Sequence, residues 1–313
     1  MTSKNTNSLE TWPITQSAWP ILSSKPGNRI AGRAISTFIN NGQCHLTTVE
    51  VYEDGAIGCW GILDRKSFEE KLTSRWVVPY PVEAEQRISV FNFGTTGFTD
   101  ATWIQSVETI AKEVDAALAG FGRDGAMGFE PKPHYGNLAW FESRPFRLLA
   151  GTGSQQILGE SVPILRRTGE AFELTRLTIY ADSLWQVGSG DLSPISDLGA
   201  AFLDGQFAES AEQKSFVRVP GLGKFRTTGR FGAVAQEDRI SEVKDKLATL
   251  KGEPSVITTC MTRFMEFERE PSAERKEALR SSYFAVPRQL RRFCGDMNSQ
   301  DLPIRAALEL DRR

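Results

Sequence analysis

Four arginines near the C-terminal end are the side chains best suited to bind an anion, because a planar guanidinium group can donate two parallel hydrogen bonds to a phosphate or carboxylate. These arginines are Arg288, Arg291, Arg292 and Arg305. The acidic residues of the same segment are Asp296, Asp301 and Glu309. Because the local charge is nearly balanced, the pattern is compatible with an anion clamp but favours ion pairs that dock this segment on the rest of the protein.

Two aspartates follow similar strand-like segments, at Asp54 and Asp182. If both faced one site, they could act as paired carboxylates in acid–base catalysis. Each of them precedes a Gly or a Ser, however, where an Asp side chain accepts hydrogen bonds from the backbone of a turn. We therefore interpret both as turn residues.

The segment Glu242-Val243-Lys244 resembles half of the motif that metal-dependent nucleases use. That chemistry needs the Glu and Lys on a strand, next to a second carboxylate that holds the metal ion. Here the two residues lie in an amphipathic helical pattern. We therefore expect Glu242 and Lys244 on a solvated helix face.

Two further combinations are weak candidates. Cys44 and His45 are neighbours on a predicted strand, so their side chains point to opposite faces and do not readily form a catalytic pair. A short basic run could contact a phosphate group, but the glycines near it lack the spacing of a nucleotide-binding loop. The run consists of Lys224, Arg226 and Arg230.

The composition excludes several classes of protein. The 313-residue chain has a net charge of −2, which argues against a dedicated polyanion binder. Four cysteines without a Cys-x-x-Cys pair and only two histidines predict reduced thiols, no metal site and no cofactor. Residues 1–10 lack the apolar core of a signal peptide, and no run of about 18 apolar residues occurs, so we expect a cytoplasmic protein without a membrane span.

A nine-residue pattern occurs twice, at residues 46–54 and 174–182, with Leu, Thr, Tyr and Asp at matching positions. The offset between the two copies is 128 residues. A Thr-Thr-Gly turn recurs at an offset of 132, from Thr95 to Thr227, and a helical pattern recurs at about 133. Because the three features keep their order, the sequence predicts an internal duplication.

The predicted fold class is α+β, with two related units that each contain a small antiparallel sheet with helices on one face. A mainly helical extension follows the second unit. The predicted divisions are an extended N-terminal arm (1–27), a first α+β unit (28–125), a linker with possible strands (126–160), a second α+β unit (161–252) and the extension (253–313).

Local signals predict several of the elements. Asn41-Gly42 predicts a tight hairpin turn. Asp64 is a candidate N-cap of a helix at 66–72, and Ser272 is a candidate N-cap in the extension. Residues 256–267 fit either a strand or a helix.

Two segments, 51–61 and 295–305, resemble stretches of uncharacterised bacterial proteins with no assigned activity. The resemblance implies a bacterial, cytosolic setting and points to no particular activity.

The sequence favours a non-enzymatic binding or regulatory protein that acts through contacts with another protein. Trp76, Trp103 and Trp140 could anchor such a partner. The alternative is a hydrolase or nuclease that uses carboxylates and arginines at a site between the two units. A third interpretation is nucleic-acid binding through the basic tail.

Overall fold

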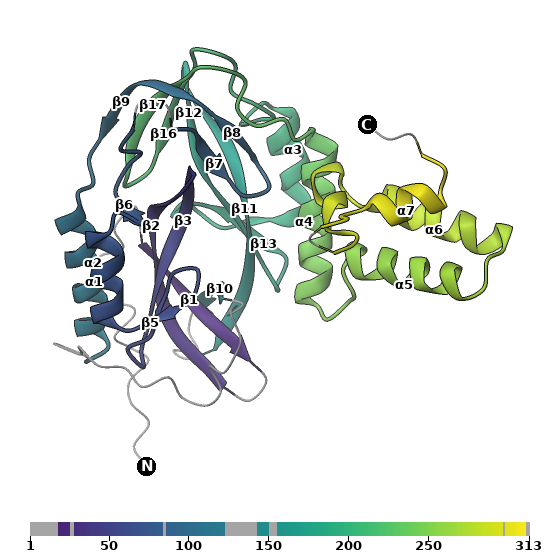
Figure 1. The fold of residues 1–313 in the computed structure, drawn as a ribbon, viewed down its shortest axis with the longest axis horizontal. Coiled ribbons are helices and arrows are strands. Elements are labelled where there is room, and N and C mark those ends of the chain that lie inside the picture. Colours follow the sequence, from purple (N-terminus) through teal and green to yellow (C-terminus); the bar gives the residue numbers. More distant parts are fainter. Residues whose placement is uncertain are drawn as a thin grey trace.

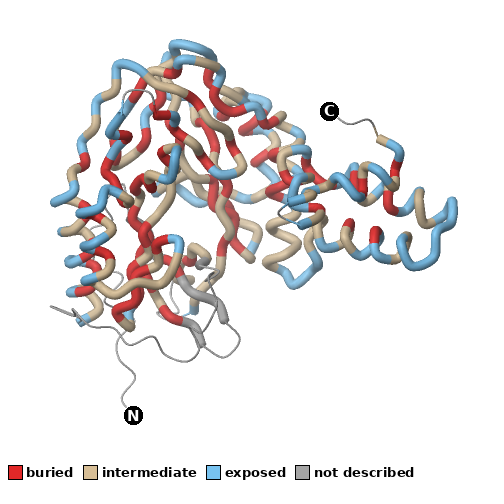
Figure 2. The backbone as a smooth tube through the Cα atoms, viewed as in Figure 1, coloured by how far each residue is buried: buried red, intermediate tan, exposed pale blue. Residues whose placement is uncertain are grey.

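The computed structural model describes residues 18–25, 28–83, 86–122, 143–149, 155–296 and 298–310. These residues form an α+β fold in which two similar units of strands and helices precede a smaller helical region (Figure 1). Buried residues follow the strands of the two units and the inner faces of the helices (Figure 2).

The first unit is built around a long hairpin of β2 (Asn28–Asn41) and β3 (Gln43–Tyr52). Gly42 lies in its turn with a φ of +74°, which confirms the turn predicted from Asn41-Gly42. Asp64 caps α1, because its Oδ1 accepts a hydrogen bond from Ser67 N at 2.6 Å. In chain order, the elements are β1 (Ala18–Lys25), β2 (Asn28–Asn41), β3 (Gln43–Tyr52), β4 (Ile57–Gly58), β5 (Ile62–Leu63), α1 (Arg65–Thr73), β6 (Val77–Val78), β7 (Ile88–Val90), β8 (Gly94–Thr96), β9 (Phe98–Trp103) and α2 (Val107–Gly120).

The second unit repeats this order except that its described residues form no strand equivalent to β9, and it is built around the hairpin of β11 (Gln156–Thr168) and β12 (Ala171–Tyr180). Its elements are β10 (Ser143–Leu148), β11 (Gln156–Thr168), β12 (Ala171–Tyr180), β13 (Leu184–Val187), β14 (Ser193–Pro194), the 3₁₀ helix η3 (Ile195–Asp197), α3 (Leu198–Leu203), β15 (Phe207–Ala208), β16 (Phe216–Val219), β17 (Gly223–Thr227) and α4 (Gln236–Leu250).

The strand pairings of the two units match. In each unit, a short strand lies antiparallel to the first strand of the hairpin, as β6 does to β2 and β15 does to β11. Another short strand lies parallel to the second strand of the hairpin, as β7 does to β3 and β16 does to β12. This shared and unusual pairing confirms the predicted duplication.

The two units share one sheet that closes on itself through two seams. At the first seam β1 pairs with β10, while β1 also pairs with β2 and β10 with β11. At the second seam β9 of the first unit pairs with β17 of the second. Strand β9 is separated from β8 only by Gly97, and β8 pairs with β7 of the first unit. The continuous chain from β8 to β9 therefore connects the strands of the second unit back to those of the first.

The closed sheet divides most of the apolar core into three parts, besides a smaller cluster that includes Ile21, Ala34 and Tyr52. Helices α1 and α2 cover the outer face of the first hairpin, and α3 and α4 cover that of the second (Figure 1). Along β3, Val49 and Val51 face the helices, whereas Leu46 faces the opposite side, as the two-residue period of a strand requires. Strands from both units enclose the central part, which includes Phe38, Leu165, Leu174 and Phe225.

The repeated tyrosine of the nine-residue pattern lies opposite a glycine in both units. Tyr52 pairs with Gly32, and Tyr180 pairs with Gly159. A Cβ atom at Gly32 would lie 2.8 Å from Cδ1 of Tyr52, and one at Gly159 would lie 3.0 Å from Cδ1 of Tyr180. In each copy the ring therefore occupies the space that a side chain on the neighbouring strand would need.

The two Thr-Thr-Gly turns are not equivalent in the structure, so that part of the prediction is wrong. Gly94 and Gly223 begin the equivalent strands β8 and β17, with φ values of +150° and +144°. They are separated by 129 residues. Thr95 therefore corresponds to Lys224 rather than to Thr227, and the apparent match was three residues out of register.

Two expected boundaries differ from the observed elements. Residues 18–25, assigned from the sequence to the extended arm, form β1 inside the closed sheet. In the expected linker, residues 143–148 form β10, and β11 begins at Gln156. Residues 123–142 lie outside the described residues.

The C-terminal extension contains three α-helices and one 3₁₀ helix around its own apolar core. Ser255 and Ser272 cap two of the helices by accepting hydrogen bonds from backbone N–H groups three residues later, as predicted for Ser272. The ambiguous residues 256–267 are helical. The elements are α5 (Val256–Arg269), α6 (Ala273–Ala285), η4 (Arg288–Phe293) and α7 (Leu302–Ala307). None of the described helices is long and apolar enough to cross a membrane.

Replacing Gly32 or Gly159 by Ala should lower the free energy of unfolding by roughly 1–3 kcal/mol in each case, because the methyl group would overlap the tyrosine ring. It would also lie 2.9 Å from a backbone oxygen in both copies. Gly199→Ala in α3 is the matched control, since apart from its chain neighbours and the backbone of its own helix no atom lies within 4 Å of the added Cβ. Urea unfolding measures the three values. Equal stability of Gly32→Ala and Gly199→Ala would contradict this packing.

Candidate functional site

A buried ion pair on α4 connects the second unit to the C-terminal extension. Arg239 Nη1 lies 2.5 Å from Glu242 Oε2, and the two side chains are only 4% and 2% exposed. Their spacing of three residues places them on one face of the helix. The prediction of a solvated face for Glu242 is therefore wrong.

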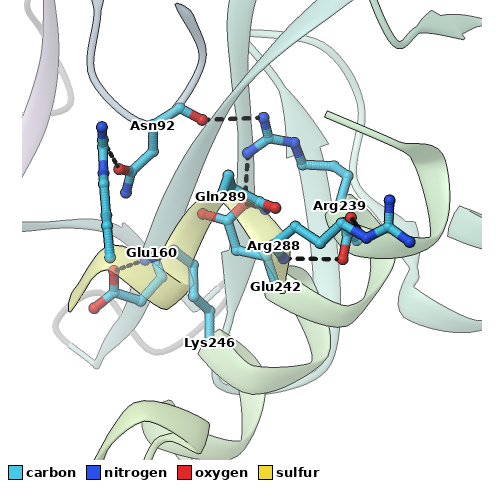
Figure 3. Close-up of polar contacts among 9 residues, drawn as sticks. Asn92, Glu160, Arg239, Glu242, Lys246, Arg288 and Gln289 are labelled. Carbon is cyan, nitrogen blue, oxygen red and sulfur yellow. Dashed lines mark hydrogen bonds and ion pairs between the residues drawn. The ribbon is translucent and has the colours of Figure 1, made fainter. Parts of the chain in front are cut away.

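The ion pair receives one hydrogen-bonding partner from each side of the junction. Arg239 Nη2 donates to the backbone oxygen of Asn92, in the turn between β7 and β8, at 3.4 Å. Gln289 Nε2, on η4, donates to Glu242 Oε2 at 2.9 Å. Figure 3 shows the four side chains together. The pair thus joins the first unit, the second unit and the extension.

Burial dominates the electrostatics of this pair. Loss of hydration lowers the pKa of the Arg239 guanidinium, while the charge and the hydrogen bond of Glu242 oppose this effect. Removing two charges from water costs several kcal/mol per ion, so the pair is tolerated only with good geometry and further hydrogen bonds. The contacts with Asn92 and Gln289 meet this requirement.

A second set of polar contacts surrounds the pair and holds the same segments. Arg292 Nη2 donates to Asn92 Oδ1 at 2.9 Å, and the backbone N–H of Arg288 donates to Asp238 Oδ1 at 3.1 Å. On the same face of α4, one turn after Glu242, Lys246 Nζ donates to Glu160 Oε2 on β11 at 3.2 Å (Figure 3). The start of η4 is therefore fixed to α4 and its end to the β7–β8 turn.

An exposed aromatic and cationic surface lies beside this polar junction. Phe91 is 70% exposed, and its ring centroid lies 5.8 Å from that of Phe293, which is 36% exposed. The guanidinium carbon of Arg292 lies 4.9 Å from the Phe293 centroid and 5.9 Å from that of Phe91. The Arg288 side chain is 77% exposed. We call these three residues, Phe91, Arg292 and Phe293, together with the exposed Arg288 at the opposite end of η4, the junction surface.

The four tail arginines have separate partners. Arg288 and Arg292 belong to the junction surface. Arg291 donates from Nε to Val286 O at 3.0 Å and lies 5.2 Å above the rings of Tyr283 and Phe284. Arg305 lies in α7. The anion clamp stays a prediction.

The acidic residues of the tail contact groups other than Arg288, Arg291 and Arg292. Asp296 accepts hydrogen bonds from the backbone of Asn298 and Ser299. Asp301 accepts one from Tyr283 Oη at 2.5 Å. Glu309 pairs with Lys276 at 2.6 Å. Arg288 and Arg292 instead dock the extension through Asp238 and Asn92, which lie across the junction. Arg291 binds backbone oxygens within the extension itself.

Two of the three candidate tryptophans pack against the cores of the two units and are not part of the junction surface. Trp76 is partly buried against the first unit's core, with Lys71 Nζ 4.4 Å above its ring. Trp103 packs on the central core, with its ring centroid 5.5 Å from that of Phe38. Trp140 lies outside the described residues.

The candidate catalytic residues are not brought together. Asp54 Oδ1 accepts a hydrogen bond from Ala56 N at 3.1 Å, the turn role that the sequence predicts, whereas Asp182 pairs with Arg147. Cys44 Sγ donates to Gln86 Oε1 at 3.1 Å, and burial raises the pKa of its thiol to about 12. Within the described ranges, no group of three or more His, Cys, Asp or Glu side chains could hold a metal ion.

Phe91, Asn92 and Arg239 were not among the residues predicted to be functional. A comparison of α2 with α4 could have drawn attention to Arg239. When the two helices are aligned from their first residues, Arg239 corresponds to the buried Ile110. A charged residue in an apolar position of a repeat marks a place where the copies differ. No comparable signal exists for Phe91, whose exposure depends on the folded junction.

Comparison with known families divides the chain at the same junction. A family model described as "Domain of unknown function (DUF7638)" matches residues 21–120 and 150–254. A second, described as "Domain of unknown function (DUF7639)", matches residues 255–310. No curated protein and no solved structure matches the chain. The contacts of Asp238 and Glu242 with η4 therefore cross the boundary between the two matched regions.

Replacing Glu242 by Ala should lower the free energy of unfolding by roughly 3–5 kcal/mol, because it leaves the buried Arg239 without its counter-charge. We also expect faster proteolysis within residues 255–310, since Gln289 loses its acceptor. Urea unfolding and limited proteolysis measure the two effects.

Glu266→Ala is the matched control. It breaks an Arg–Glu pair of the same spacing on α5, at 2.7 Å, in which both side chains are at least partly exposed. Its cost should stay below about 0.5 kcal/mol. A similar small loss for Glu242→Ala would contradict a structural role for the buried pair.

Proposed function

The chain belongs to the DUF7638 family, and we propose that it is a non-enzymatic binding or regulatory protein that acts through protein–protein contacts at the junction surface. The observation that supports this most is the exposure of Phe91 and Phe293 next to Arg292 on a backbone that buried polar contacts hold in place. A bacterial, cytoplasmic setting is part of the same proposal.

The chemical character of the junction surface fits this role. Binding energy at protein interfaces is concentrated in a few aromatic and arginine side chains. When a partner covers an exposed phenylalanine, apolar surface is removed from water. This stabilises the complex by about 25 cal/mol per Å² of apolar area. A single exposed Phe is common on protein surfaces and does not indicate a binding site. Two exposed rings in contact with an arginine form a compact patch, which does.

The rigidity of the surface favours binding as well. Phe91 precedes Asn92, whose backbone oxygen and side chain are both held, by Arg239 and Arg292 respectively. Phe293 ends η4, whose Gln289 is held by Glu242. A surface that is already ordered loses less conformational entropy when it binds.

The charge of the surface supports a proposal for the chemical character of the partner. Arg288 and Arg292 are cations, and Arg288 is only weakly paired, with its Nε 3.9 Å from Asp238 Oδ2. We therefore propose that the partner presents an acidic segment that also contains aliphatic or aromatic side chains. The carboxylates would contact the two arginines, and the apolar side chains would cover the two rings.

Selection from a display library of random linear peptides tests this proposal. The intact protein should enrich peptides that combine Asp or Glu with large apolar residues. The variants Phe91→Ala/Phe293→Ala and Arg288→Ala/Arg292→Ala should each weaken the binding of the enriched peptides by roughly tenfold or more, as expected for interface residues that contribute over 1 kcal/mol. Fluorescence polarisation measures these affinities, and circular dichroism confirms that each variant is folded.

Two control variants lie outside the junction surface. Leu203→Ala removes an apolar side chain from a residue that is 82% exposed on α3, and Arg263→Ala removes an exposed arginine on α5. Both should bind the peptides as the unmodified protein does. Enrichment of peptides that bind all variants equally would overturn the proposal. The proposal would also be overturned if the protein bound single-stranded nucleic acid and no peptides, and if only the Arg288→Ala/Arg292→Ala variant lost that binding.

A further inference from the structure

Three ring side chains of the first unit form a cluster that reaches the surface. The ring centroid of Trp60 lies 5.2 Å from that of His45 and 5.8 Å from that of Trp76, with interplanar angles of 56° and 85°. Lys71 Nζ lies 4.4 Å from the ring centroid of Trp76. Trp76 packs against the core beneath α1 and α2, whereas Trp60 is 46% exposed. We call His45, Trp60, Lys71 and Trp76 the ring platform.

Trp60 has a backbone conformation that a large side chain rarely adopts. Its φ is +50°, and among the described residues it is the one aromatic residue with a positive φ. This left-handed region is disfavoured for every residue with a Cβ atom, and a bulky residue there is an outlier. The turn between β4 and β5 is therefore strained in order to present this ring, and such strain is often found at functional sites.

The second unit has the same turn conformation but carries a glycine there. Ile57 on β4 and Trp185 on β13 pair with equivalent residues of β3 and β12. Counted from these two residues, Trp60 corresponds to Gly188, whose φ is +55°. The fold thus requires a left-handed residue at this position, for which glycine is the unstrained choice. Nothing in the shared scaffold requires a tryptophan.

The end of α1 places Trp76 and Lys71 together. The backbone N–H of Arg75 donates to Leu72 O at 3.1 Å, and that of Trp76 donates to Lys71 O at 3.0 Å. These two hydrogen bonds form a Schellman motif, in which Arg75 takes the left-handed position with a φ of +58°. The motif brings the Lys71 side chain over the indole of Trp76, so the ammonium group is held at the platform.

The end of α3 has the same motif without these side chains. Gly205 takes the left-handed position with a φ of +72°, and the backbone N–H of Gln206 donates to Ala201 O at 3.2 Å. All four platform residues are therefore replaced in the second unit. The counterparts of His45, Trp60, Lys71 and Trp76 are Glu173, Gly188, Ala201 and Gln206. Since both copies keep the backbone geometry, a role in folding common to the two units does not explain the platform.

We propose that the ring platform binds the pyranose ring of a neutral carbohydrate. Such a sugar has one face of C–H groups, which packs on the flat apolar surface of an indole, and a rim of hydroxyl groups that form hydrogen bonds. The half-exposed ring of Trp60 supplies the apolar surface. Two rigid turns hold the platform in place, so little conformational entropy is lost on binding.

The polar groups of the platform match the hydroxyl rim. Within the parts of the chain that the structure describes, no acceptor is bonded to the indole N–H of Trp60 or Trp76, and no carboxylate pairs with Lys71. The imidazole of His45 can both donate and accept. The platform therefore offers several hydrogen-bond donors beside an apolar ring, which is the combination that a sugar requires.

The charges near the platform disfavour two other classes of ligand. Aromatic rings also attract cations, but a cationic ligand would meet the ammonium of Lys71 above Trp76. A single-stranded nucleic acid stacks its bases on such rings and needs a positively charged groove for its phosphates. Here the exposed Glu69 and Glu70 directly precede Lys71 on α1. A neutral sugar is not repelled by either charge.

Saturation-transfer difference NMR of the full-length protein with a panel of neutral sugars tests the proposal. The panel consists of glucose, galactose, mannose and N-acetylglucosamine, together with their disaccharides. At millimolar concentrations at least one of them should receive saturation, most strongly at the C–H protons of one ring face. A titration followed by tryptophan fluorescence then gives the affinity.

The variant Trp60→Gly separates the platform from the fold, because it introduces the residue that the second unit carries at the same turn. It should stay folded by circular dichroism and weaken sugar binding by roughly tenfold or more. Lys71→Met keeps the aliphatic stem over Trp76 but removes the donor, and it should weaken binding as well. Leu203→Ala, at the exposed end of α3, is the control and should bind the sugar as the unmodified protein does.

Three outcomes would overturn the proposal: no sugar of the panel binds, Trp60→Gly binds the sugar with unchanged affinity, or the platform binds an oligonucleotide instead. If Trp60→Gly failed to fold, Lys71→Met would decide, since unchanged sugar binding in that variant refutes the site. The binding of acidic peptides at the junction surface should be the same in Trp60→Gly and in the unmodified protein. Failure of the proposed function would therefore leave this test unaffected.

Discussion

The buried ion pair between Arg239 and Glu242 is the constraint on which the arrangement of the three parts depends. A charged pair with almost no exposure is stable only if its remaining donors and acceptors are satisfied. Those partners are the backbone oxygen of Asn92 in the first unit and the side chain of Gln289 in the extension. The pair therefore fixes where both segments lie, and the exposed rings of Phe91 and Phe293 are placed as a result.

The duplication explains why this pair occurs only once. Both units place a helix over the outer face of a hairpin, and both pack a tyrosine ring on a glycine. In α2 the position that corresponds to Arg239 is Ile110, which fills an apolar core. In the first copy this helix position is part of an apolar core, whereas in the second copy the equivalent helix holds the extension. The proposed binding surface thus arises from a difference between two otherwise similar copies.

The sequence predicts the features that depend on local chemistry and fails where distant segments meet. The hairpin turn at Gly42 and the caps at Asp64 and Ser272 follow from a few neighbouring residues, and each is confirmed. The α+β class and the duplication also follow from repeated local patterns. The burial of Glu242 does not, because it depends on Gln289, which lies 47 residues further along the chain. The false match of the two Thr-Thr-Gly turns shows that a three-residue motif is too short to set the register of a repeat.

The second seam of the closed sheet affects how a growing chain can fold. Strand β9 is complete when Trp103 has been made, but its partner β17 ends at Thr227. During synthesis on the ribosome, more than a hundred further residues must emerge before β9 finds its neighbour. Until then its unpaired N–H and C=O groups are open to pairing with other chains. A cell that makes this protein must therefore protect or quickly complete that strand, and slow translation between the two units would prolong the exposed state.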